Sequence, residues 1–97
     1  MEDKLTSKQR ATLRSMANTL EPIVSIGKEG ITPALQKSAW DALETHELVK
    51  CAVQKNAPMD AKEACAALCE AVHAHPVQCI GSKFTIYRRA RKPVIEI

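Results

Sequence analysis

Residues 23–33 read Ile-Val-Ser-Ile-Gly-Lys-Glu-Gly-Ile-Thr-Pro and lead from a short apolar segment into a helix. The apolar residues at 23–26 predict a buried strand. Gly27 and Gly30 follow, and glycine lets the backbone adopt turn dihedrals and approach a ligand closely. Lys28, between them, adds a cation at the tip of the loop. A G-x-x-G loop of this kind, placed ahead of a helix, is suited to bind phosphate.

The helix after the loop has clear start signals. Thr32 is a good N-cap, and Pro33 fits the first helical position. Unpaired N–H groups and the positive end of the helix dipole then face the loop. A phosphate could bind these groups together with Lys28, while Glu29 is expected to point away. The alternative is that the loop only connects a strand to a helix.

Capping boxes predict two further helices, because a short polar side chain and a Glu or Gln three residues later can each bond to the other's backbone. A proline, which cannot continue a helix, follows each predicted helix. The boxes and prolines are Thr6-x-x-Gln9 with Pro22, and Asp60-x-x-Glu63 with Pro76. The helix after the loop is expected to run to about Thr45.

Apolar alternation predicts three more strands, of which the last two are joined by a Gly81-Ser82 turn. These strands span residues 48–54, 77–80 and 83–89. The element order is α-β-α-β-α-β-β, with a helix between each pair of the first three strands. The sequence therefore predicts an α/β fold, a four-stranded mixed sheet packed by helices.

Length and composition predict one folded domain over residues 1–97, because 45% of the 97 residues are hydrophobic. No apolar run approaches the roughly 20 residues that a membrane helix needs. The N-terminus lacks the apolar segment of a secretory signal. We therefore expect a cytoplasmic protein that does not enter a membrane.

The net charge of +3 is unevenly distributed. Residues 1–20 hold four basic and two acidic side chains, whereas residues 21–70 hold five basic and eight acidic ones. Residues 71–95 hold five basic side chains and no acidic one. Both ends of the chain are positive, which suggests a basic face for a polyanion. The alternative is a basic tail that only keeps the protein soluble.

Aromatic side chains are scarce, with one Phe, one Trp and one Tyr. Domains that read RNA bases on a sheet surface usually stack them on several aromatic rings. Recognition is therefore expected to rest on backbone phosphates and to depend strongly on salt. Tyr87, beside Lys83 and Arg89 on one strand face, is the best candidate for a single stacking contact, and the alternative is a core tyrosine with its hydroxyl at the rim.

Four cysteines offer a possible metal site. Cys65, Cys69 and His73 are spaced four residues apart on the third predicted helix, and Cys79 could be a fourth ligand. However, Cys65 and Cys69 fall within the apolar stripe of that helix, so free buried cysteines are the favoured interpretation. No serine, cysteine or carboxylate lies in a recognisable catalytic motif. No enzyme activity, cofactor, metal or small-molecule substrate is predicted.

Four separate blocks, in order along the chain, resemble the YhbY family of bacterial stand-alone CRM domains. The resemblance covers about residues 5–89, and residues 90–97 form a tail beyond the usual end of the family. The blocks are Leu5-Thr-x-Lys8-Gln9-Arg10-x-x-Leu13-Arg14, Ile26-Gly-Lys-Glu-Gly-Ile31, His46-Glu47-Leu48-Val49-Lys50, and Ile80-Gly81-x-Lys83 with Tyr87-Arg88.

This resemblance implies an RNA-binding domain with a fold like that of the C-terminal domain of translation initiation factor 3. It also implies a non-enzymatic role on ribosomal RNA, in assembly of the large ribosomal subunit. The RNA-binding positions of the family correspond to the loop, the first helix and the terminal hairpin, here Gly27, Lys28, Glu29, Gly30, Lys8, Arg10, Arg14, Lys83 and Arg88.

A protein-interaction module is the alternative function. Such a module would dock through the acidic second helix and through the apolar residues of the C-terminal tail, Val94, Ile95 and Ile97.

Overall fold

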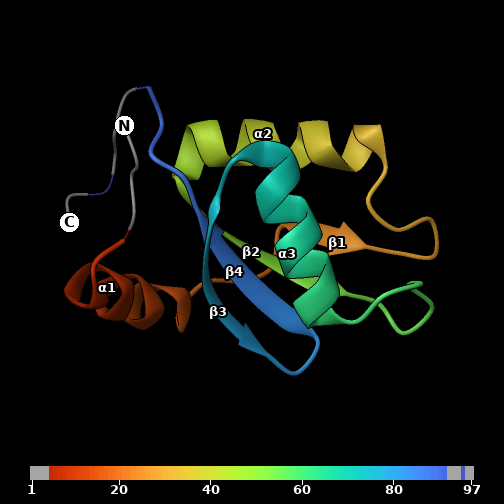
Figure 1. The fold of residues 1–97 in the computed structure, drawn as a ribbon, viewed down its shortest axis with the longest axis horizontal. Coiled ribbons are helices and arrows are strands. Elements are labelled where there is room, and N and C mark those ends of the chain that lie inside the picture. The colour runs from red at the N-terminus through yellow and green to blue at the C-terminus, as the bar shows by residue number, and fades with distance from the viewer. Residues whose placement is uncertain (1–4, 92–94, 96–97) are drawn as a thin grey trace.

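A computed structural model describes residues 5–91 and residue 95, and it confirms the predicted α/β fold (Figure 1). The elements follow the order α-β-α-β-α-β-β. Their bounds are α1 Ser7–Ala17, β1 Val24–Ile26, α2 Pro33–His46, β2 Leu48–Val53, α3 Ala61–Val72, β3 His75–Ile80 and β4 Lys83–Tyr87. Among the described helices, none is long and apolar enough to cross a membrane.

The helix starts lie where the capping residues predict them. Thr6 Oγ1 accepts a hydrogen bond from the backbone of Gln9 at 3.1 Å, and the Gln9 side chain accepts one from the Thr6 N–H at 3.0 Å. Asp60 and Glu63 exchange the same pair of bonds at 2.8 and 3.1 Å. Thr32 caps α2. Each cap is worth about 1 kcal/mol of helix stability, so all three starts are encoded locally.

The end of α3 differs from the prediction. The helix stops at Val72, where His73 takes a left-handed conformation with φ +59°, and Pro76 lies within β3 rather than before it. β3 is an edge strand with an irregularity between Pro76 and Gln78. Proline is tolerated at such a position because an edge strand has no partner for every N–H group.

The four strands form a mixed sheet in the order β1-β2-β4-β3. β1 pairs with β2 in parallel, whereas β4 is antiparallel to both β2 and β3. Phe84 of β4 lies between Cys51 of β2 and Cys79 of β3. The last strand of the chain is therefore inserted into the sheet beside the second strand.

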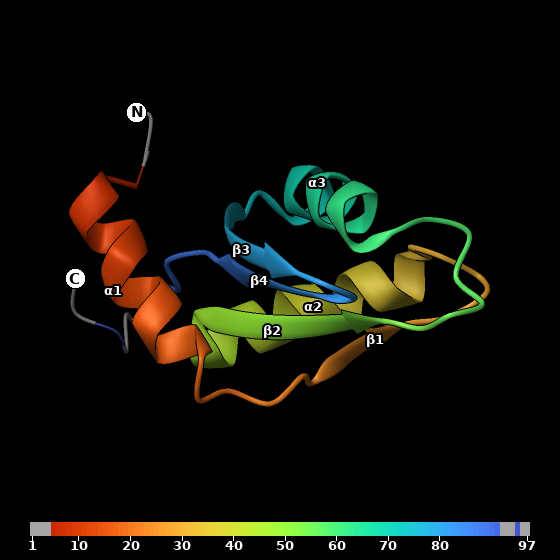
Figure 2. The ribbon, with the colours of Figure 1, turned by 90° about the horizontal axis from the view of Figure 1, so that it is seen from below.

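Two hydrophobic clusters pack the two faces of the sheet. The larger one lies under α2 and α3 and includes Leu43, Val49, Leu68, Phe84 and Ile86. The smaller one lies under α1 and consists of Leu13, Leu48, Val77 and Tyr87, with Leu5, Leu20 and Ile95 partly buried at its edge. In Figure 2 the strands lie in front of α2, and α1 is confined to one end of the sheet. Much of one sheet face is therefore not covered by a helix.

Three of the four cysteines are buried in the larger cluster, including Cys65 and Cys69, which the sequence predicts to be buried. These are Cys51, Cys65 and Cys69, whereas Cys79 is exposed. Burial raises the pKa of the Cys51 thiol to about 12, with a contribution from the nearby Cys65. Within the described part of the chain, no three His, Cys, Asp or Glu side chains are grouped to hold a metal ion.

Glu47 attaches the chain after β4 to the start of β2. Its side chain has no exposed surface, and its backbone has φ +65°. Its carbonyl oxygen accepts a hydrogen bond from Arg88 N. Its carboxylate accepts two more, from Ala90 N at 2.8 Å and from Ile95 N at 2.6 Å. Part of the C-terminal tail is thus anchored to the domain.

Candidate nucleic-acid interface

The uncovered part of the sheet displays polar and basic side chains. Alternation along the strands places the side chains of Lys50, Thr85 and Lys83 opposite to those of Val49, Phe84 and Ile86, which pack under the helices. Strand pairing aligns these residues in cross-strand rows. One row contains Ser25, Ala52, Lys83 and Ile80, and the next contains Lys50, Thr85 and Gln78. We call this surface the strand face.

Charges are separated between the strand side and the helix side of the molecule. Helix α1 and the four strands contain five basic residues and no acidic one, namely Lys8, Arg10, Arg14, Lys50 and Lys83. Helices α2 and α3 contain four acidic residues, Asp41, Glu44, Glu63 and Glu70, against Lys37 and Lys62. The other acidic residues that the structure describes, Glu21, Glu29, Glu47 and Asp60, lie in connections. Folding thus places a positive surface opposite a negative one.

The basic residues of α1 lie at one end of the strand face. Lys8 and Arg14 are exposed. Arg10 is half-buried, and its Nη1 donates to the Pro76 carbonyl at 3.1 Å, which holds α1 against β3. Arg10 therefore supports the structure as well as adding charge.

Lys50 lies at the centre of the strand face, although it was not among the residues predicted to bind RNA. Its Nζ donates to the carbonyl of Ala17, at the end of α1, over 3.4 Å. The charge of Lys50 therefore lies between the basic residues of α1 and Lys83 of β4. The signal was present in the sequence, because Lys50 alternates with the apolar Val49 and Cys51 and must therefore lie on the opposite face of the sheet from them.

The G-x-x-G loop is a tight turn in which Gly30 N donates to Gly27 O at 3.0 Å. Lys28 and Glu29 are both exposed at its corner. Gly30 has φ +72°, and a Cβ there would lie 3.2 Å from Met59 Cε. Glycine is therefore required at position 30 by the backbone and by packing. The Gly30 N–H is used within the turn, so fewer donors are left for a phosphate than the sequence suggests.

The loop and α1 lie at opposite ends of the molecule (Figure 1). Lys83 is closer to the loop, because it shares a cross-strand row with Ser25 of β1 at roughly two strand spacings, or about 10 Å. The predicted basic residues do not gather around the loop. They form a basic band that runs from α1 over the strand face to the loop, through Lys8, Arg10, Arg14, Lys50, Lys83 and Lys28.

Arg88 lies away from this band, on the helix side. Its Nη2 is 2.7 Å from Glu44 Oε2, and its Nη1 donates to the Val72 carbonyl at 2.9 Å. The guanidinium also lies 3.8 Å from the ring centroid of Trp40. With a side chain only 12% exposed, Arg88 joins the end of β4 to α2 and α3. Its donors are directed at protein groups, so we assign it a structural role.

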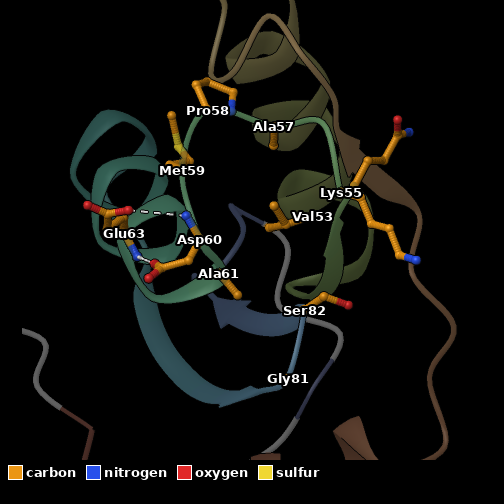
Figure 3. A pocket seen from close by; sticks show the side chains of 11 residues that line it. Val53, Lys55, Ala57, Pro58, Met59, Asp60, Ala61, Glu63, Gly81 and Ser82 are labelled. Carbon is orange, nitrogen blue, oxygen red and sulfur yellow. Dashed lines mark hydrogen bonds between the residues drawn. The ribbon is translucent and has the colours of Figure 1, made fainter.

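A shallow depression of about 550 Å³ lies beside the loop end of the sheet, between residues 53–63 and the turn at residues 81–82 (Figure 3). Lys55 lines one side of it, and the carboxylates of Asp60 and Glu63 line the other. These carboxylates cap α3 and would repel a phosphate. The depression is therefore a poorer polyanion site than the strand face.

The chain is similar to known proteins over nearly its whole length. A model of the CRS1/YhbY (CRM) domain family matches residues 5–88. The probable RNA-binding protein YqeI of Bacillus subtilis is 35% identical over 88 residues, which cover 91% of this chain and 92% of that protein. An RNA-binding protein of Haemophilus influenzae is 31% identical over 94 residues, with coverages of 96% and 94%.

A solved structure is similar as well. The solution structure of the hypothetical protein SAV1595 from Staphylococcus aureus has a TM-score of 0.78 and 43% sequence identity, and the match covers 92% of this chain and 93% of that one.

Proposed function

This chain belongs to the CRS1/YhbY (CRM) domain family, and we propose that it is an RNA-binding protein whose basic band contacts the RNA backbone. The observation that carries the proposal is the separation of charge between the two sides of the molecule. Helix α1 and the strands hold cations only, so a polyanion would meet no carboxylate on these elements. Similar proteins from two bacteria carry RNA-binding protein as their name, which supports RNA as the polyanion.

The exposed ends of the basic band would supply most of the phosphate contacts. Lys8 and Arg14 are exposed at one end, and Lys83 and Lys28 at the other. Each phosphate that these cations neutralise releases bound counterions, so RNA affinity should fall steeply with salt. The G-x-x-G loop would contribute Lys28 at the edge of the interface, with Gly27 and Gly30 setting its shape.

We further propose that the RNA is ribosomal and that the protein acts without catalysis in assembly of the large ribosomal subunit, in the cytoplasm. This finer proposal comes from the resemblance to stand-alone CRM domains. Crosslinking in cells followed by sequencing of the bound RNA tests it. We expect recovery of a defined segment of large-subunit rRNA. Recovery spread over messenger RNA would contradict the ribosomal target but not RNA binding.

Two double variants with the same change in net charge test the interface. Arg14→Ala with Lys28→Ala removes one cation from each end of the basic band. Lys37→Ala with Lys62→Ala removes two exposed cations from the helix side. We expect the first pair to lower affinity for large-subunit rRNA about tenfold or more, and to reduce the slope of log affinity against log salt by roughly 1.5–2. The second pair should change both quantities little.

Filter binding over a salt series measures both quantities, and thermal unfolding checks that the variants fold. Equal losses for the two double variants would show that only net charge matters, and the basic band would not be the interface. Absence of RNA binding by the unmodified protein would contradict the proposed function itself.

Protein docking through α2 is a second candidate, favoured by one observation. Trp40 is 42% exposed on α2, and tryptophan is common among residues that dominate protein interfaces. The C-terminal tail is less suited to this role, because Ile95 packs against the cluster under α1. Val94 and Ile97 lie outside the described residues. A pull-down tests this function. A protein partner that is still captured after ribonuclease treatment, but is no longer captured by Trp40→Ala, would support it.

A further inference from the structure

A second, smaller depression lies on the strand face beside the end of α1. Its volume is about 160 Å³, and its lining includes Asn18, Lys50, Gln78, Ile80, Lys83 and Thr85. It lies within the basic band, between Arg14 of α1 and the loop end of the sheet. None of the described residues that line it carries a carboxylate. An inference about it rests on the proposed function, because RNA would have to cover this face.

The floor of this depression holds an unusual hydroxyl group. Thr85 is 1% exposed, and within the described part of the chain its Oγ1 has no hydrogen-bond partner. Buried polar groups in folded proteins are nearly always hydrogen-bonded. Thr85 lines the depression and lies between Lys50 and Gln78 in the strand pairing. A buried, unpartnered hydroxyl between two polar side chains points to a ligand atom.

The groups around Thr85 match the edge of a nucleobase better than a phosphate alone. The carboxamide of Gln78 can both donate and accept a hydrogen bond, as can the Thr85 hydroxyl. Ile80, which is 65% exposed, offers an apolar surface at the rim. Lys83 is exposed at the rim and can meet a phosphate. Hydroxyl, amide, apolar and cationic groups therefore meet at one place.

Lys50 can change partners when a ligand arrives. Its bond to the Ala17 carbonyl, at 3.4 Å, is longer than the usual N–H···O distance of about 2.9–3.0 Å. A phosphate oxygen would be a stronger acceptor, because a bond between two charged groups is shorter and stronger than one to a neutral carbonyl.

We infer that this depression binds one unpaired nucleotide of the RNA. Thr85 and Gln78 would bond to the edge of its base, while Lys83 and Lys50 would hold its phosphate. In paired RNA the bases are stacked inside the helix, with their edges in a major groove too deep and narrow for side chains or along a shallow minor groove, so a base can enter the depression only after it has left the helix. This site would let a face without exposed aromatic rings distinguish bulged or looped RNA from duplex.

Two variants remove the proposed base contacts while keeping side-chain size. Thr85→Val replaces the hydroxyl by a methyl group and keeps the β-branched shape that suits a strand. Gln78→Met removes the amide. Matched controls on the helix side are Thr45→Val and Gln36→Met, both on α2. Because the Thr85 hydroxyl has no partner among the described residues, Thr85→Val should unfold at an unchanged or higher temperature.

The probes are a hairpin RNA with a single-nucleotide bulge and the same hairpin without it, with each of the four bases in the bulge. By fluorescence anisotropy, we expect the unmodified protein to prefer at least one bulged hairpin. Thr85→Val and Gln78→Met should each weaken that complex about five- to tenfold, as loss of one or two hydrogen bonds implies. Their affinity for the unbulged hairpin should stay the same, and both controls should behave like the unmodified protein.

Chemical-shift mapping separates base binding from phosphate binding. We expect nucleoside monophosphates to shift the amide resonances of Thr85 and Gln78 clearly more than inorganic phosphate does at the same concentration. Equal shifts with inorganic phosphate would overturn the base contact. Full affinity of Thr85→Val and Gln78→Met for every bulged hairpin would overturn the inference while leaving the basic band intact. Failure of the unmodified protein to bind any hairpin would instead count against RNA binding.

Discussion

Glu47 is a buried carboxylate whose removal should be costly. It accepts hydrogen bonds from the backbone N–H groups of Ala90 and Ile95. Glu47→Ala leaves these donors without the carboxylate, and an unsatisfied buried donor costs about 1–3 kcal/mol. We expect the free energy of unfolding to fall by roughly 2–5 kcal/mol in urea titrations. Glu70→Ala, on the exposed side of α3, should change it by less than about 0.5 kcal/mol. Similar values for both variants would contradict the anchoring role.

The two glycines of the loop should respond differently to substitution. Gly30→Ala places a Cβ 3.2 Å from Met59 and 3.3 Å from Pro58, on a backbone with φ +72°. A left-handed conformation alone costs an alanine about 1–2 kcal/mol. A Cβ on Gly27 would meet only the Gln54 side chain, at an ordinary 3.5 Å.

Thermal unfolding should therefore show a drop of several degrees for Gly30→Ala and a smaller one for Gly27→Ala. The opposite order would mean that the turn adjusts around position 30.

Two basic residues show how far the site can be predicted at this scale. The charges of Arg88 and Lys50 are visible in the sequence, but their directions depend on the register of their strands. Arg88 continues the alternation of Phe84 and Ile86, which pack under the helices, and it ends beside Glu44. The same alternation places Lys50 on the opposite face. Strand alternation, applied to every charged residue, places Arg88 on the helix side and Lys50 on the strand face. Counts of charge along the sequence do not distinguish these two residues.

At the scale of elements, the helices were more predictable than the order of strands. Capping by Thr6, Thr32 and Asp60 is local, so the sequence marks each helix start directly. Strand order depends on contacts between distant segments. One signal was available in the sequence: residues 84–87 read Phe-Thr-Ile-Tyr, an uninterrupted run of strand-forming residues that suits a central strand, and all four are buried in the structure. Pro76 likewise suits an edge strand.

The packing of α3 predicts which thiols react. Cys65 and Cys69 face the sheet, and Cys51 faces them from β2. The hydrogen bond to Cys65, together with burial, raises the pKa of Cys69, and burial raises that of Cys51 to about 12. A raised pKa keeps a thiol protonated at pH 8, and only the thiolate attacks a disulfide reagent.

The hydrogen bond with Cys69 lowers the pKa of Cys65, so this thiol is protected by burial instead, whereas Cys79 is exposed although burial of part of its surface raises its pKa. Ellman's reagent at pH 8 should therefore modify Cys79 promptly and the other three thiols only after unfolding. In Cys79→Ala the prompt reaction should disappear. Two or more prompt thiols in the folded protein would show that α3 opens readily from the sheet.

At the scale of the whole molecule, folding places the basic and acidic segments of the chain on two opposite surfaces. The sequence shows basic ends and an acidic middle. Because the middle supplies α2 and α3 while α1 and the hairpin form the opposite side, folding turns a pattern along the chain into one across the sheet. What the sequence could not show is the distance between the loop and α1, because sheet topology places them at opposite ends of a molecule 36 Å long.

This separation of charge gives the protein an electric dipole moment directed across its sheet. Near a polyanion, the field exerts a torque that turns the cationic side forward before the surfaces touch, which raises the fraction of collisions that lead to binding. The same dipole favours head-to-tail contacts between copies of the protein, cationic side against acidic side, when little salt is present. At physiological ionic strength the screening length of about 8 Å is shorter than the molecule, so such self-association is suppressed.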